Sequence, residues 1–77
     1  MSSPIDVFVS FRGRQVRPMS FTSGNRTYDV KHVHLVHTER RGREKVYIFS
    51  VSDDANAFRL TFSTETLMWN LEEGALL

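Results

Sequence analysis

The 77-residue sequence contains no cysteine, only two prolines and no long hydrophobic run. Without cysteine the chain can form neither a disulfide framework nor a thiolate zinc site, and nothing points to an oxidising compartment. No apolar stretch approaches the roughly 20 residues needed to cross a bilayer, and the first residues lack the pattern of a secretion signal. We therefore expect a cytoplasmic protein that does not enter a membrane.

The apolar spacing of three and four residues that marks an amphipathic helix is also missing over any length, whereas alternation with a period of two recurs. The chain is 40% hydrophobic and has nine aromatic residues, which is enough to fold but allows one small core only. We expect a single β domain over residues 1–77, with residues 1–4 and 74–77 as frayed tails. The predicted fold is all-β: a small antiparallel SH3-like or open barrel of five or six strands, built from consecutive hairpins.

Two hairpins fix a register for the predicted sheet. A strand over residues 27–38 and the run "KVYIFSVS" flank a polar turn, which we centre on Arg41 and Gly42, so that Val36 lies opposite Tyr47. A loop at "DDAN" then sets Phe49 against Leu60. The expected core consists of Val30, Val36, Tyr47, Phe49, Val51, Phe58, Leu60, Phe62 and Trp69.

The segment over residues 64–73 is compatible with a helix or a strand. As a helix it would place Glu72 and Glu73 at the negative end of the helix dipole, where carboxylates are unfavourable. As a strand it alternates Leu67, Trp69 and Leu71 with polar or flexible residues. We favour the strand.

The order of these elements resembles a group of small bacterial all-β domains of unknown function. The resemblance is carried by a Pro-x-x-Phe stretch, a glycine turn, a Val-x-x-Val strand and a terminal Trp-x-Leu, here Pro18, Phe21, Gly24, Val30, Val33, Trp69 and Leu71. All of these residues pack or turn. The resemblance therefore implies the fold and assigns no activity.

Three histidines lie within six residues and raise the question of a metal site. On a regular strand His32 and His34 share one face while His37 points to the other, so all three meet at one ion only if a bulge resets the phase. We predict no metal here. The sequence also lacks a nucleophile elbow, a phosphate loop and a zinc-protease helix, so we expect no enzyme activity and no cofactor.

Basic residues are the clearest surface feature. Residues 1–45 carry nine cations and four carboxylates, a net +5, whereas residues 46–77 carry one cation and five carboxylates, a net −4. Small barrels commonly use basic loops to bind nucleic acid without sequence preference. The residues available for such contacts are Arg12, Arg14, Arg17, Arg40, Arg41, Arg43 and Lys45.

Apolar residues also crowd the sheet face opposite the expected core. These are Val33, Leu35, Val46 and Ile48. A second apolar face must be covered by barrel closure, by a terminus or by another chain. The leading functional hypothesis is accordingly a non-enzymatic binding or accessory module that meets a protein partner or a second copy through this face, and nucleic-acid binding is the alternative.

Overall fold

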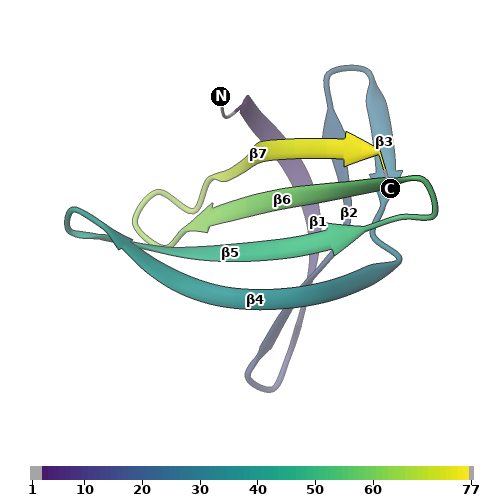
Figure 1. Cartoon of the computed structure of the whole chain (residues 1–77). Helices are drawn as coiled ribbons and strands as arrows, with labels where there is room; N and C mark the ends of the chain where they lie inside the picture. Colours follow the sequence, from purple (N-terminus) through teal and green to yellow (C-terminus); the bar gives the residue numbers. More distant parts are fainter. Residues whose placement is uncertain (1–2, 77) are drawn as a thin grey trace.

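The computed structural model describes residues 3–76 as one antiparallel sheet of seven strands curled into a half-barrel. The strands are β1 (Ser3–Arg12), β2 (Gln15–Ser23), β3 (Arg26–Asp29), β4 (His32–Arg41), β5 (Glu44–Ser52), β6 (Asn56–Ser63) and β7 (Trp69–Leu76). Their order across the sheet is β3-β2-β1-β7-β6-β5-β4 (Figure 1). The all-β open barrel predicted from the sequence is confirmed, although the sheet has seven strands and not five or six.

The additional strand arises because the segment expected as one strand over residues 27–38 is broken. The amide of Val30 donates to the carbonyl of Met19, and the next amide, that of Lys31, donates to the carbonyl of Ser52 (both 2.9 Å). The chain therefore leaves β2 and joins β5 within two residues. This switch separates β3 from β4 and makes them the two edges of the sheet.

Three hairpins share the same turn chemistry. Gly13, Gly24 and Gly42 each occupy the first position of a two-residue loop with φ between 58° and 68°. Glycine with positive φ at this position is the type II′ signature, whose twist matches that of the flanking strands. The β4–β5 loop is consequently Gly42–Arg43, not Arg41–Gly42.

Because the loop lies one residue later than expected, residues 35–40 of β4 each pair with a residue two positions further along the chain than predicted. Val36 lies opposite Phe49, and the predicted pairing of Val36 with Tyr47 is wrong. In the β5–β6 hairpin the predicted pairing of Phe49 with Leu60 is confirmed. Its loop is held by Asp53, whose Oδ1 accepts hydrogen bonds from the amides of Ala55 and Asn56 at 2.8 and 2.6 Å.

The segment over residues 64–73, for which the sequence allowed a helix or a strand, forms a turn followed by a strand. Ser63 Oγ accepts hydrogen bonds from the amides of Glu65 and Thr66, both at 3.2 Å, and Leu67 adopts a φ of 60° before β7 begins at Trp69. Strand pairing includes Ser3 and Pro4 at one end of the chain and residues 74–76 at the other, so these are not tails in the structure. The rest of the expected tails, residues 1, 2 and 77, lies outside the described residues.

The core lies on the inner face of the half-barrel. Five of the expected residues are buried: Val30, Phe49, Val51, Leu60 and Trp69. Tyr47, Phe58 and Phe62 are partly buried against them. Val36 was also expected in the core but is 45% exposed, because β4 is an edge strand and no neighbour covers its free side.

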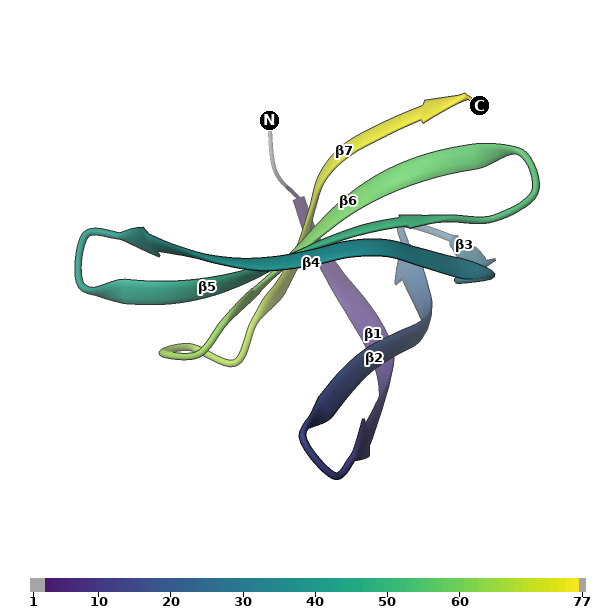
Figure 2. The ribbon, with the colours of Figure 1, turned by 60° about the horizontal axis from the view of Figure 1, so that its bottom comes forward.

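The N-terminal hairpin completes this core with residues that were not in the predicted list. Ile5 and Phe21 are buried, and the Phe21 ring packs edge-on against Phe58 with centroids 5.0 Å apart. Figure 2 shows the β1–β2 hairpin projecting away from the β4–β5 hairpin, so that the inner face opens between them. Among the described residues, no helix is long and apolar enough to cross a membrane.

Candidate binding cleft

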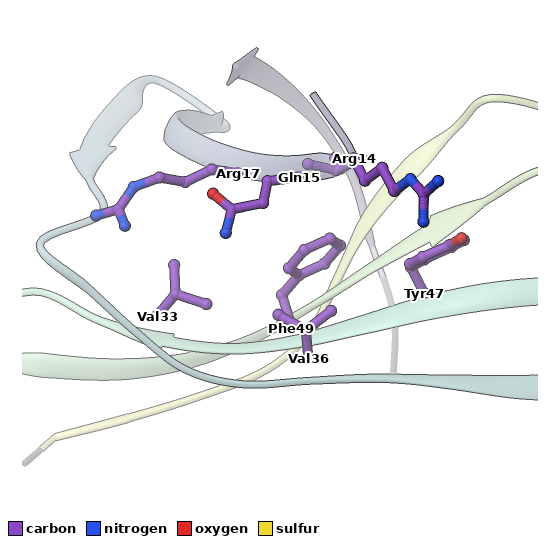
Figure 3. A pocket seen from close by; sticks show the side chains of 8 residues that line it. Arg14, Gln15, Arg17, Val33, Val36, Tyr47 and Phe49 are labelled. Atoms are coloured by element: carbon purple, nitrogen blue, oxygen red, sulfur yellow. The ribbon is translucent and has the colours of Figure 1, made fainter. Parts of the chain in front are cut away.

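A cleft of about 350 Å³ lies between the two diverging hairpins. We call it the basic cleft. One wall is formed by the β1–β2 hairpin and consists of Arg14, Gln15, Val16 and Arg17, and the other is formed by β4 and β5 and consists of Val33, Val36, Tyr47 and Phe49. Figure 3 shows the arginines and the glutamine reaching from the first wall toward the apolar and aromatic side chains of the second.

The cleft combines cations with an aromatic ring. Arg14 and Arg17 lie on one wall and Tyr47 on the other. Lys45 is not a lining residue, but its Nζ lies 5.4 Å from the centroid of the Tyr47 ring. No carboxylate is among the residues that line the cleft in the described part of the chain. Its lining therefore favours an anionic ligand that also presents a flat or apolar surface.

Strand alternation extends this basic surface along the β4–β5 hairpin. Phe49 and Tyr47 point to the inner face, and two residues further Lys45 points the same way. Arg40 lies directly opposite Lys45 and shares its face. Two cations facing each other across a strand pair repel, so this pair lowers the stability of the hairpin unless an anion lies between them.

The carboxylates of the same hairpin point to the outer face. Glu39 and Glu44 occupy the alternate positions of β4 and β5, together with Arg41. Of these two acids, Glu39 pairs with Arg41 on the outer face. Alternation along the two strands separates the charges by face.

Arg41 is held by carboxylates and is not free to bind an anion. Its Nη2 donates to Glu72 Oε1 at 2.8 Å, and its Nε donates to Glu39 Oε1 at 3.2 Å. The hydrogen bond to Glu72, followed by that to Glu39, raises the pKa of the Arg41 guanidinium above its ordinary value. This network occupies the outer face and leaves the inner face cationic.

The structure divides the seven basic residues that were named from the sequence as possible nucleic-acid contacts. Arg14 and Arg17 line the basic cleft, and Arg40 and Lys45 share the inner face with Tyr47. Arg41 faces outward. The remaining two, Arg12 at the end of β1 and Arg43 in the hairpin loop, are exposed but are not among the residues that line the cleft.

The four apolar residues expected on the opposite face do not form an open surface. Val33 packs against the inner core, because a bulge at His34 changes the phase of β4. Val46 and Ile48 do lie on the outer face but are 4% and 0% exposed. On the same face as Val46 and Ile48, the Arg41–Glu72 ion pair joins β4 to β7, and β5 and β6 lie between these two strands in the sheet. Leu35 alone of the four is exposed, at 56%.

The same bulge changes the placement of the histidines. On the C-terminal side of the bulge, Leu35 and His37 lie on the outer face, and His32 lies on the same face before the bulge. The expected division of the three imidazoles between two faces is therefore wrong. His34 Nε2 lies 2.6 Å from Ser52 Oγ, and the His32 and His34 rings are 6.0 Å apart. Within the described residues, no group of three or more histidine or carboxylate side chains is arranged to hold a metal ion.

The sequence interpretation missed the positions of Tyr47 and Phe11 relative to the cleft. Tyr47 was assigned to the core, but it also lines the basic cleft. Phe11 is 69% exposed and lies directly across from Val16, another cleft residue. The alternation of acids and cations in "ERRGREK" was a readable signal, because alternation along each strand places Glu39 and Glu44 on one face and Arg40 and Lys45 on the other.

Comparison with known proteins does not identify a relative. No family model, no curated protein and no solved structure matches the chain. The resemblance to small bacterial domains is thus without support from a family match, and any function must be argued from the chain's own surface.

Proposed function

We propose that the protein is a non-enzymatic binding module that holds nucleic acid in the basic cleft without sequence preference. The observation that carries this proposal is the separation of charge by face: the acids of the β4–β5 hairpin point outward while Arg40 and Lys45 point inward beside Tyr47. Phosphates are the natural counter-charges for such a surface, and arginine and lysine contacts to phosphate carry no sequence information.

Fluorescence anisotropy of a labelled single-stranded oligonucleotide tests this proposal. If three or four phosphates are contacted, the slope of log affinity against log salt should be about −2 to −3, at −0.7 per phosphate. We expect dissociation constants of about 1–100 μM at physiological salt, the range of ordinary non-specific binding, and tighter binding at low salt. Absence of binding below about 100 μM at low salt would overturn the proposal.

A matched pair of double variants locates the site. Arg14→Ala/Arg17→Ala removes two charges from the cleft wall, whereas Arg26→Ala/Arg41→Ala removes two charges elsewhere. We expect the first to weaken binding at least tenfold and the second to change it by less than about threefold. Equal losses would show that total charge, and not the cleft, governs binding.

A protein partner, the leading expectation from the sequence, is retained as a second candidate on a different surface. It rests on β4, which is an edge strand with one unpaired side and carries Leu35 on its outer face at 56% exposure. Exposed edge strands pair readily with other chains. Self-association through this edge predicts a dimer by sedimentation equilibrium at about 100 μM, which Leu35→Lys should return to monomer. A monomeric parent protein would exclude a second copy as the partner.

A further inference from the structure

Tyr47 is a feature of the basic cleft that a site for phosphate alone does not require. Its ring is partly buried on the inner face, 6.5 Å from Phe49 and inclined to it by only 21°. Lys45 Nζ lies near the same ring, and in Figure 3 the Arg14 side chain reaches toward it from the opposite wall. An aromatic ring flanked by cations is the arrangement on which proteins stack nucleobases beside bound phosphates.

The position of Tyr47 decides which form of nucleic acid can use it. The ring lines a cleft of about 350 Å³ between two hairpins and does not stand on a convex surface. In a duplex every base is stacked on its neighbours and paired along its edge, so none offers a free face. Only an unpaired base can enter the cleft and lie against the ring, and a volume at the small end of ligand pockets suits one nucleotide.

We propose that the basic cleft selects single-stranded nucleic acid by accepting one unpaired base against Tyr47. Arg14 and Arg17 hold the phosphates on one side of that base and Lys45 those on the other. This inference rests on the proposed function and adds the form of the nucleic acid and the group that recognises it. Because every base has an aromatic face, selection is for strandedness and not for sequence.

Phe11 extends the same surface at the tip of the N-terminal hairpin. It is directly opposite Val16, a residue of the cleft wall, whereas Phe8 alternates to the other face of β1. Both rings are largely exposed, at 69% and 78%. They form a matched pair: Phe11→Ala should weaken single-strand binding, and Phe8→Ala should leave it unchanged.

Four probes test the inference by anisotropy competition. They are an octathymidylate, the same sugar-phosphate chain without bases, a duplex of equal length, and polyglutamate. Because stacking of one base contributes about 1–3 kcal/mol, the octathymidylate should bind about 5-fold to about 100-fold more tightly than the base-free chain. It should exceed the duplex by a similar factor.

Variants of Tyr47 supply the second readout. Tyr47→Phe should keep the preference for bases, and Tyr47→Leu should remove most of the preference for octathymidylate over the base-free chain without changing the affinity of the latter. If Tyr47→Leu does not fold, titration of the parent protein with octathymidylate should still shift the Tyr47 ring resonances in NMR, while the base-free chain should not.

The outcomes separate this inference from the function on which it rests. Equal affinity for octathymidylate, base-free chain and duplex would overturn base insertion and leave the polyanion site standing. Failure of all nucleic-acid probes to bind would overturn the proposed function itself. Tighter binding of polyglutamate than of octathymidylate would contradict both and identify an acidic polypeptide as the ligand.

Discussion

Phe49 and Val36 face each other across β5 and β4, yet one is fully buried and the other is 45% exposed. Alternation in the sequence predicts that both point inward and cannot distinguish them. What separates them is the position of each strand in the sheet, since β5 has neighbours on both sides and β4 on one. That order depends on long-range pairing, which no local pattern records.

This cross-strand pair gives a stability prediction. Phe49→Ala should lower the free energy of unfolding by about 3–5 kcal/mol, because it leaves a cavity in the core. Val36→Ala should lower it by about 1 kcal/mol or less, since much of the side chain already contacts solvent. Denaturant titration of both variants measures the difference. Similar losses from the two would mean that β4 is covered in solution.

Asp53 gives a prediction that depends on pH. The hydrogen bond from the amide of Ala55, followed by that from Asn56, lowers the pKa of its carboxyl below the ordinary value. A lowered pKa stabilises the fold at pH values above the ordinary aspartate range and loses that contribution as pH falls through the lowered pKa. Asp53→Asn should therefore melt below the parent protein at pH 7, and the difference should shrink as pH falls below the ordinary aspartate pKa of about 3.9 and through the lowered pKa of Asp53. A constant difference across that range would contradict this account.

At the scale of elements, the hairpins show which strand registers can be predicted from the sequence and which cannot. The β5–β6 register was predictable because polar turn residues mark its loop clearly. The β4–β5 register was missed because the type II′ turn places glycine first, and the neighbouring arginines give no further cue. The bulge at His34 was not predictable, although it decides the face of Val33 and the histidines.

The loop glycine of this hairpin is open to a direct test. Gly42 has a φ of 68°, and a sparsely populated backbone conformation of this kind costs an L-residue about 1–3 kcal/mol. A Cβ at this position meets no atom within 4 Å, so strain and not collision sets the cost of Gly42→Ala. Arg43→Ala at the second loop position should cost much less. The two variants are compared by thermal melting, and equal stability would refute the assigned turn.

At the scale of the whole molecule, the basic and acidic parts of the sequence do not form a basic end and an acidic end of the fold. Strand β7, which carries Glu72 and Glu73, pairs with β1, and β6 and β7 lie between β1 and β5, so the basic and acidic parts of the chain are interleaved. The separation that survives is between the faces of the β4–β5 hairpin. Both the candidate cleft and the proposed function depend on that separation, which strand alternation in the sequence already contains, because a register shift of two residues leaves each side chain on its face.

The adjacent residues Arg40 and Arg41 test this claim most directly, since they carry the same charge on opposite faces of one strand. We compare Arg40→Ala and Arg41→Ala by anisotropy with the same oligonucleotide at low salt. Arg40→Ala should weaken binding about 3–10-fold and reduce the salt slope by about 0.7, as expected for the loss of one phosphate contact. It should not lower the melting temperature, because it relieves the repulsion with Lys45.

Arg41→Ala should change affinity by less than about twofold, because its guanidinium is bonded to Glu72 and Glu39 on the outer face. A large effect of Arg40→Ala beside a small effect of Arg41→Ala is the result that the account predicts. Equal effects of the two variants, or a larger effect of Arg41→Ala, would contradict a binding surface confined to the inner face.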